Sequence, residues 1–331
     1  MAIYQLGSKG PEVVRIQKRL QELGDYLGPI DGIFGGGTEA AIRAFQQRAN
    51  LAVDGRVGPQ TWAALFPGTS VAAPAIASEP LQFRCVALTG AFETNQPPPD
   101  CFAGLSGDFD GQGISFGVLQ WNLGQGSLQP LLREMNSAHP EILQQIFDEQ
   151  YAELQAMLQT NRDEQLTWAR SIQNARHVLD EPWQGKFKTL GRQKGFQDIQ
   201  VEFAGRLYKE ALGLCTAYGL SSARAAALMF DIKVQNGSIS DLVRAKIEQD
   251  FKQLDPTFPP DQAAVARMRI IANRRADAAN PAWVEDVRAR KLTIANGQGT
   301  VHGSIYNLQE QFGIDLSPAV QALRNSAGTG D

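Results

Sequence analysis

Apolar residues recur every three to four positions along most of this chain, a spacing that predicts a mainly helical protein. Two such faces near the N-terminus are Val13, Ile16, Leu20 and Leu23, and Ala41, Ile42, Phe45 and Ala49. The same period runs through the stretches 128–135, 141–158, 162–179, 198–217, 221–234 and 261–276. Residues 95–126 break this pattern, because they are rich in Gly, Pro and Asp and hold short β-like pieces.

The segment 67–80, PGTSVAAPAIASEP, has no hydrophobic period and has the composition of a solvated linker. A chain of 331 residues is also longer than one core usually needs. We therefore predict a three-helix domain over residues 1–67, a linker over 68–80 and a larger domain over 81–331. The larger domain is expected to be α+β, with many helices and a small β-lobe formed by residues 95–126.

Composition and charge exclude several classes of function. With 31 basic and 35 acidic residues the formal net charge is −4, which argues against a nucleic-acid binder or a binder of anionic membranes. No apolar run approaches the ~20 residues of a membrane helix, and the N-terminus lacks the pattern of a secretory signal. The few His and Cys residues lack zinc-ligand spacing, so we expect no metal or organic cofactor. We also expect a monomer.

The pattern D-G-x-x-G-x-x-T occurs twice, at residues 31–38 and 54–61. Each Asp-Gly pair favours a tight turn, because Gly tolerates a positive φ. Thr38 and Thr61 are each well placed to accept a backbone N–H and begin a helix. The repeat therefore predicts a compact helical unit with two equivalent turns.

These repeats belong to a longer pattern that spans nearly all of residues 4–66. Its segments are Gly7-Ser-Lys-Gly10, Val14-x-x-Gln17-x-x-Leu20, Ile30-Asp-Gly-Ile-Phe-Gly35, Phe45-Gln46, Asp54-Gly55 and Thr61-Trp62. Together they resemble the peptidoglycan-binding domain of type 1. The resemblance implies a noncatalytic module that holds cell-wall glycan or its peptide stems; the alternative is that the repeats only build a helical bundle. The candidate wall-binding residues are Asp31, Gly32 and Phe34.

Carboxylates flank the irregular stretch of the larger part. Glu93 ends an apolar segment, and apolar neighbours would raise its pKa so that it can donate a proton near neutral pH. Asp110 lies in a polar turn, where a carboxylate stays ionised. Two carboxyl groups of this kind are what hydrolysis of a glycosidic bond requires, although surface or capping roles are the common alternative. Asp108 would point to the same side of an extended strand as Asp110 and is the alternative base.

The run Glu93 … Gly107-Asp-x-Asp110-Gly-x-Gly-x-Ser115-x-Gly117 resembles the active-site signature of family 46 glycoside hydrolases, the chitosanases. Gln112 stands where that family usually has arginine, which removes a fixed charge near the base. The continuation to Gln120 also resembles a Gly-x-x-Gln strand of lysozyme-like lytic transglycosylases, which share a helical fold with a β-lobe beside the cleft. The candidate substrate-binding residues are Ser115, Gln120 and Asn122.

A second block supports the same resemblance. Residues 228–237 resemble the family's central helix with its buried Asp, here Asp231. Residues 275–277 and 290–297 resemble its Arg-x-Asp and Arg-to-Gly segments. The resemblance implies that Asp231 bridges Arg275 and Arg290, with Arg290 nearest the acid. A carboxylate partner is also expected on physical grounds, because an unpaired arginine in a core is costly. The alternative is that both arginines lie on exposed helix faces.

The resemblance implies an enzyme that hydrolyses β-1,4 bonds of an amino-sugar polymer, with Glu93 as general acid and Asp110 as general base. Such a pair predicts inversion at the anomeric carbon and a carboxyl separation of about 6.5–9.5 Å. The wall-binding module favours peptidoglycan, as in a muramidase or endolysin, whereas the family and the acidity of the larger part would suit chitosan. A lytic transglycosylase and a noncatalytic wall-binding or phage-structural protein are further alternatives.

Two matters stay open at this stage. A disulfide between Cys85 and Cys101 would pin the loop after Glu93, but the odd cysteine count leaves that pairing undecided; Cys215 is expected to be a small buried residue. The delivery route is also open. Without an export signal, a wall-acting enzyme would reach the cell wall or periplasm through phage lysis or a secretion system.

Overall fold

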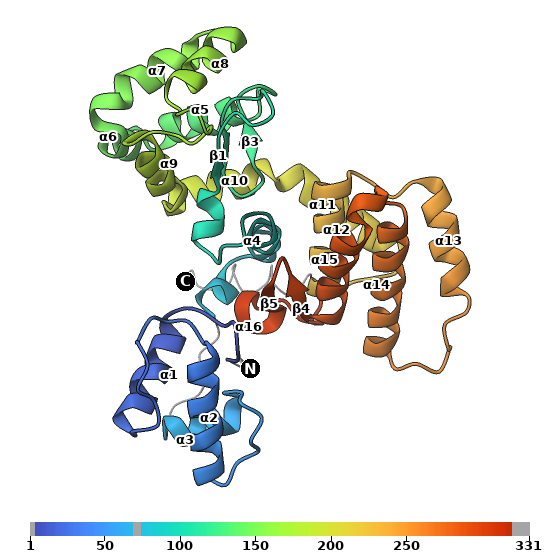
Figure 1. Ribbon diagram of the computed structural model, residues 1–331. Helices are drawn as coiled ribbons and strands as arrows, with labels where there is room; N and C mark the ends of the chain where they lie inside the picture. The colour runs from blue at the N-terminus through green and yellow to red at the C-terminus, as the bar shows by residue number, and fades with distance from the viewer. Residues whose placement is uncertain (1–3, 69–73, 320–331) are drawn as a thin grey trace, which may run out of the picture. The chain divides into compact units, whose positions relative to one another are not determined.

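The computed structural model of the protein describes residues 4–68 and 74–319 (Figure 1). Its elements are mainly helices, with one three-stranded and one two-stranded sheet among the described residues, which confirms the predicted mainly helical fold with a small β-lobe. The described residues fall into two compact units, the first within Met1–Glu79 and Ala245–Ser317 and the second within Pro80–Arg244 and Pro318–Asp331. Part of the predicted linker, 69–73, lies outside the described residues, and the predicted domain boundaries stay predictions.

The N-terminal helices pack around one apolar core. They are α1 (Pro11–Glu22), α2 (Gly36–Arg48) and α3 (Pro59–Leu65), followed by a short 3-10 helix η1 (Ala75–Ser78). Pro11 is the first residue of α1, where a helix does not need the N–H that proline lacks. The predicted apolar faces form the core except at Leu23, which is half-buried, and Ala49, which is exposed. Core side chains that are fully buried include Val13, Ile16, Leu20, Phe34, Ile42 and Val57.

The predicted threonine caps are wrong. Helix α2 already begins at Gly36 and α3 at Pro59, so Thr38 and Thr61 lie inside the first turn of their helices and cap neither. Both hydroxyl groups are buried and accept hydrogen bonds from glutamines instead, Thr38 from Gln17 at 3.3 Å and Thr61 from Gln46 at 3.1 Å. The Thr hydroxyl of each repeat therefore binds a glutamine side chain of the preceding helix and does not begin a helix.

The rest of the first unit contains helices and a hairpin. Its further elements are α13 (Asp241–Phe251), α14 (Pro260–Asp277), η4 (Pro281–Trp283), α15 (Val284–Asn296), β4 (Gln298–Val301), β5 (Ser304–Asn307) and α16 (Leu308–Phe312). The boundary between the two units, at Ala245, falls inside α13. Helices α14 and α15 pack along one another, and β4 continues from α15 into an antiparallel pair with β5. Gly297 ends α15 in a left-handed conformation, as a helix C-terminus favours.

The second unit is built around helix α4 (Leu81–Thr94), which is hydrophobic on all sides and buried over nearly its whole length. Its remaining elements are η2 (Asp100–Ala103), β1 (Leu105–Ser106), β2 (Ser115–Phe116), β3 (Trp121–Asn122), α5 (Leu128–Ala138), α6 (Pro140–Phe147), η3 (Asp148–Gln150), α7 (Tyr151–Gln159), α8 (Arg162–Ser171), α9 (Trp183–Gly191), α10 (Lys194–Phe203), α11 (Gly205–Ala217) and α12 (Ala223–Asn236). Helices α10 and α12 both pack against α4.

The β-lobe is anchored to this helical core. Its three short strands pair antiparallel in the order β1-β2-β3, with Ser115 opposite Asn122. Phe116 of β2 is fully buried and stacks on Phe196 of α10, with ring centroids 5.5 Å apart. Gly90 lets the strand-to-strand turn approach α4, because a Cβ at this position would lie 2.0 Å from Val118. The lobe is therefore held directly against the helix that carries Glu93.

Candidate active site

Glu93 lies in the last turn of α4, just before the left-handed Asn95 ends the helix. Its side chain is exposed, although the eleven buried residues of α4 precede it. The expectation that Glu93 lies in an apolar niche is therefore wrong, because the helix leaves the core at this turn. Glu93 instead lines a cavity of about 530 Å³ with residues from η2, β1 and α9.

Two polar side chains of the β-lobe form part of the same cavity wall. Ser106 of β1 donates a hydrogen bond to the side-chain oxygen of Gln120 at 3.0 Å, and the Gln120 amide donates to the Gly117 carbonyl at 2.9 Å. Gln120, a predicted substrate-binding residue, is thus held in one orientation beside the Glu93 cavity. Ser106 was missed by the sequence analysis, although it opens the stretch that contains both aspartates.

Asp108 is a buried carboxylate with both oxygens engaged. Its Oδ2 accepts from Arg170 Nε at 2.6 Å, and its Oδ1 accepts from the Gly113 N–H at 2.7 Å. Burial by itself would raise the pKa of Asp108, but the Arg170 guanidinium and the Gly113 N–H stabilise the carboxylate and hold the pKa below its usual value. Asp108 therefore ties the loop to the end of α8.

Asp110 is exposed in the same loop. Its Oδ1 accepts from the Gln112 N–H at 3.0 Å, and its Oδ2 accepts no hydrogen bond from the described residues. The described residues that line the Glu93 cavity include neither Asp108 nor Asp110. The predicted roles of the two aspartates, and the predicted separation between Glu93 and Asp110, stay predictions.

The two other predicted substrate-binding residues pair with each other across the lobe. Ser115 is half-buried on β2, opposite Asn122 on β3. Asn122 is buried, and its side-chain oxygen accepts from the Gln125 N–H at 2.8 Å. This contact holds the turn after β3, so Asn122 has a structural partner whatever its role toward substrate, which stays a prediction.

The predicted ion network involves three different helices. Asp231 is fully buried on α12 and accepts from the Thr89 hydroxyl of α4 at 3.2 Å. Arg290 is also buried, on α15, so the alternative of an exposed arginine is wrong for this residue. Arg275, on α14, is half-buried, and its Nε has no hydrogen-bond partner among the described residues. Desolvation lowers the Arg275 pKa. The bridging role of Asp231 stays a prediction.

All three cysteines are buried free thiols, so no disulfide joins Cys85 to Cys101. Burial raises the pKa of each thiol, that of Cys215 to about 12. Among the described residues no group of His, Cys, Asp and Glu side chains is arranged to hold a metal ion. Nor does any described helix combine the length and apolarity needed to cross a membrane.

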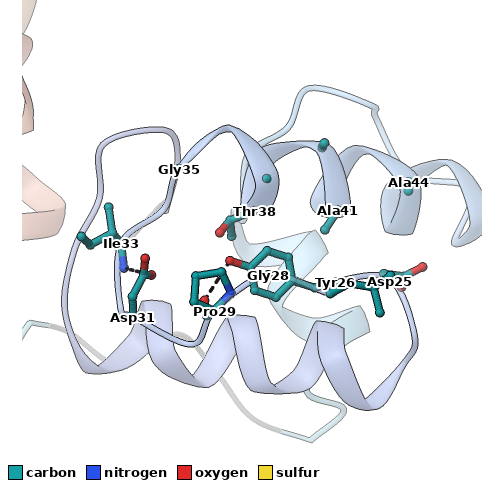
Figure 2. Close-up of a pocket in the computed structure, with 13 residues that line it drawn as sticks. Asp25, Tyr26, Gly28, Pro29, Asp31, Ile33, Gly35, Thr38, Ala41 and Ala44 are labelled. Atoms are coloured by element: carbon teal, nitrogen blue, oxygen red, sulfur yellow. Dashed lines mark hydrogen bonds between the residues drawn. The ribbon is translucent and has the colours of Figure 1, made fainter.

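A second cavity, of about 570 Å³, lies beside the first repeated turn in the N-terminal helices (Figure 2). Asp31, Ile33 and Leu27 are among its lining residues, and Leu27 is 95% exposed. Gly32 is not among the lining residues, and Phe34 is fully buried in the helical core. Of the predicted wall-binding residues, only Asp31 therefore borders this cavity.

A buried glutamine from the preceding helix holds each repeated turn. Gln17 of α1 accepts from the Gly32 N–H at 2.9 Å and donates to Asp31 Oδ1 at 2.9 Å. The Gln17 amide and the Ile33 N–H stabilise the Asp31 carboxylate and lower its pKa.

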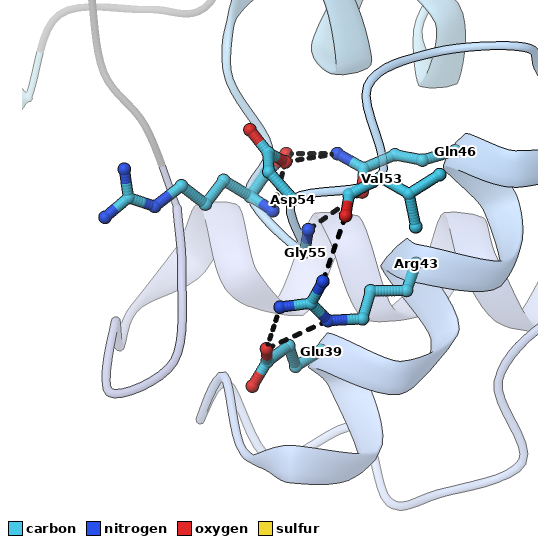
Figure 3. A network of polar contacts seen from close by, with 7 residues as sticks. Glu39, Arg43, Gln46, Val53, Asp54 and Gly55 are labelled. Carbon is cyan, nitrogen blue, oxygen red and sulfur yellow. Dashed lines mark hydrogen bonds and ion pairs between the residues drawn. The ribbon is translucent and has the colours of Figure 1, made fainter.

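Gln46 of α2 repeats this arrangement in the second turn (Figure 3). It accepts from the Gly55 N–H at 2.9 Å and donates to Asp54 Oδ1 at 2.7 Å. Arg43 adds a hydrogen bond to the Val53 carbonyl at 3.0 Å and an ion pair with Glu39 at 2.8 Å. The two turns therefore share the same hydrogen bonds as well as the same sequence pattern. In each turn a glutamine outside that pattern, Gln17 or Gln46, makes these hydrogen bonds.

Comparison with known proteins gives a family match for the N-terminal helices. Residues 9–65 match the family described as Putative peptidoglycan binding domain, which confirms the resemblance of the N-terminal region to a peptidoglycan-binding domain. A spore cortex-lytic enzyme of Bacillus cereus is 42% identical over 67 residues, or 20% of this chain and 26% of that protein. An N-acetylmuramoyl-L-alanine amidase of Mycobacterium tuberculosis is 38% identical over 76 residues, 20% of this chain and 19% of that protein. The matches thus span about a quarter or less of these relatives.

Among solved structures, a chitosanase complex is similar over 68% of this chain and 95% of that chain, with 16% identity and a TM-score of 0.42. A family 46 chitosanase of Gynuella sunshinyii bound to chitotetraose is similar over 69% of this chain and 97% of that chain. Its identity is 11% and its TM-score 0.40.

Proposed function

We propose that this protein is a cell-wall lytic enzyme that hydrolyses β-1,4 glycosidic bonds of peptidoglycan, with Glu93 as general acid. The observation that carries the proposal is the position of Glu93. It stands at the exposed end of a buried helix, on the wall of a cavity of about 530 Å³ that the polar β-lobe residues Ser106 and Gln120 also line. A carboxyl group reaching a groove beside fixed hydrogen-bonding side chains suits protonation of a glycosidic oxygen.

We propose Asp110 as the base that activates water. Both oxygens of Asp108 are occupied, by Arg170 and by the Gly113 N–H, whereas Oδ2 of Asp110 accepts no hydrogen bond from the described residues and is exposed. An exposed carboxylate oxygen can take a proton from water without first breaking an ion pair. Asp108 then supports the loop, and the reaction proceeds with inversion at the anomeric carbon.

Two observations support peptidoglycan as the polymer. Residues 9–65 match a peptidoglycan-binding family, and relatives of this region include proteins named spore cortex-lytic enzymes. A binding module tethered to a hydrolytic unit raises the local concentration of the polymer. The proposed site of action is therefore the bacterial cell wall. Chitosan and a lytic transglycosylase reaction remain the alternatives that the experiment must separate.

The test is Glu93→Gln in the full chain, assayed on purified murein and on soluble chitosan. We expect at least a 100-fold loss of turnover on murein, because the amide keeps the shape but cannot donate the proton. Glu141→Gln, at an exposed glutamate of α6 that does not line the cavity, is the matched control. Equal clearing by the Glu93→Gln variant and the parent would show that Glu93 is not the acid.

Analysis of the released sugar ends separates the two cleavage chemistries. Hydrolysis leaves reducing ends, whereas a transglycosylase leaves anhydro ends. Anhydro products that depend on Glu93 would replace the hydrolytic proposal by the transglycosylase alternative. Faster cleavage of chitosan than of murein would assign the chitosanase alternative.

A further inference from the structure

The Glu93 cavity also contains two cationic side chains from a single helix end. Lys188 lies in α9, and Arg192 caps the same helix four positions later, so both face the cavity. Lys188 is half-buried and makes no hydrogen bond or ion pair with the described residues. A lysine on a cavity wall with no carboxylate partner among the described residues can bind an anion.

Arg192 is already oriented by a carboxylate. Its Nε donates to Asp100 Oδ1 at 2.6 Å, and both residues line the cavity. The two terminal guanidinium nitrogens donate to none of the described residues. Because a guanidinium presents five N–H donors in a fixed plane, the Asp100 contact leaves an edge that can bind a second carboxylate.

The charges of the cavity favour one class of substrate. Asp100 is paired with Arg192, whereas Lys188 forms no ion pair with a carboxylate of the described residues, so Lys188 is a cation available to a ligand in the cavity. A polymer of glucosamine carries an ammonium group on each sugar, which Lys188 repels. A polymer whose sugars bear carboxylates is attracted instead.

We infer that Lys188 and Arg192 form a carboxylate-binding subsite that selects acidic amino-sugar polymers over polycationic ones. The inference rests on the proposed function and deepens it. The ligand class is a glycan whose sugars bear a lactyl carboxylate or an acidic peptide substituent. Lys188 supplies the point charge, and Arg192, held by Asp100, supplies the directional hydrogen bonds.

The test measures binding by the full chain carrying Glu93→Gln, which prevents turnover. The probes are soluble fragments of alternating N-acetylglucosamine and N-acetylmuramic acid with the peptides removed, so that each lactyl carboxylate is free, and the same fragments after methyl esterification. On the free-acid fragment we expect Lys188→Gln and Arg192→Gln each to weaken binding about tenfold. Binding of the ester should change less than twofold.

Controls separate the subsite from general effects of charge. Lys209→Gln, at an exposed lysine of α11 outside the cavity, should leave both affinities unchanged. Arg192→Lys keeps the charge and should retain more of the free-acid preference than Arg192→Gln. Because the wall-binding helices are the same in every variant, a difference between variants reports on the cavity.

The outcomes distinguish this inference from the proposed function. Equal binding of acid and ester by the starting chain, or an acid preference that survives both substitutions, overturns the subsite while leaving the role of Glu93 intact. If the parent cleaves no glycan but its acid preference is lost with Lys188→Gln, the subsite stands and the hydrolytic proposal fails.

Discussion

Asp108 and Arg170 form an ion pair, 2.6 Å from Oδ2 to Nε, that joins the loop bearing both candidate bases to the end of α8. The side chain of Asp108 is only 6% exposed, whereas that of Arg170 is 53% exposed. The Asp108 carboxylate is therefore buried and held by its partners in the fold, while solvent partly screens the Arg170 guanidinium. Asp110, in contrast, is exposed, which is why we propose it rather than Asp108 as the base.

We predict that Asp108→Asn lowers the free energy of unfolding by about 1–2 kcal/mol at neutral pH, because a charged hydrogen bond is lost and screening moderates the effect. The pKa of Asp108 is lowered in the folded state, so its contribution is fully present above the unfolded pKa of about 3.9 and is lost as the pH falls from there through the lower folded pKa. Urea denaturation at pH 7 and pH 3 measures this. A parent–variant difference equally large at both pH values would contradict the linkage.

Asp110→Asn should separate activity from stability. We predict that turnover on murein falls by about 10²–10⁴-fold, because the amide cannot accept the proton from water. The free energy of unfolding should change by less than about 0.5 kcal/mol, since the side chain is exposed and the amide oxygen can still accept from Gln112. Kinetics and denaturation on the same preparation check both parts. Full activity of this variant would return the base assignment to Asp108.

Gln17→Ala should lower the free energy of unfolding of the N-terminal helices α1–α3 by about 1–3 kcal/mol, because the Gly32 N–H loses its buried acceptor. Gln21→Ala, at an exposed position of the same helix α1, is the matched control and should be close to neutral. Thermal unfolding of the full chain and sedimentation with murein sacculi measure the effect. Equal stability of the two variants would mean that the clamp contributes little.

Leu27→Ser tests the cavity beside the first turn. The Leu27 side chain is 95% exposed and lines that cavity, so covering it with a wall ligand would bury apolar surface. We predict a loss of murein affinity of about 5- to 30-fold, equivalent to about 1–2 kcal/mol, with unchanged stability. Val53→Ser, at an exposed residue outside the cavity, is the control. The same affinity for both variants would place the wall-binding surface elsewhere.

Local spacing predicted much of the fold. The apolar faces of α1 and α2 follow from helical geometry, and the two Asp-Gly turns follow from the conformational freedom of glycine, since Gly32 and Gly55 both have a positive φ. The prediction that Thr38 and Thr61 cap their helices was wrong, because α2 and α3 begin earlier and buried glutamines donate to the hydroxyl groups. A glutamine before each turn was the available signal, but its partners lie up to twenty-one positions away.

The sequence by itself determined the helical faces, the two turns and Glu93 at the end of an apolar segment, because each depends on residues close together in the chain. Only the tertiary structure decided what surrounds Glu93. It brought Lys188 and Arg192 to the same cavity by packing α9 against η2 and β1, and it exposed a carboxyl group that its neighbours in sequence suggested was buried. Periodicity specifies which face of a helix is apolar, whereas the position at which the helix leaves the core depends on distant segments that pack against it.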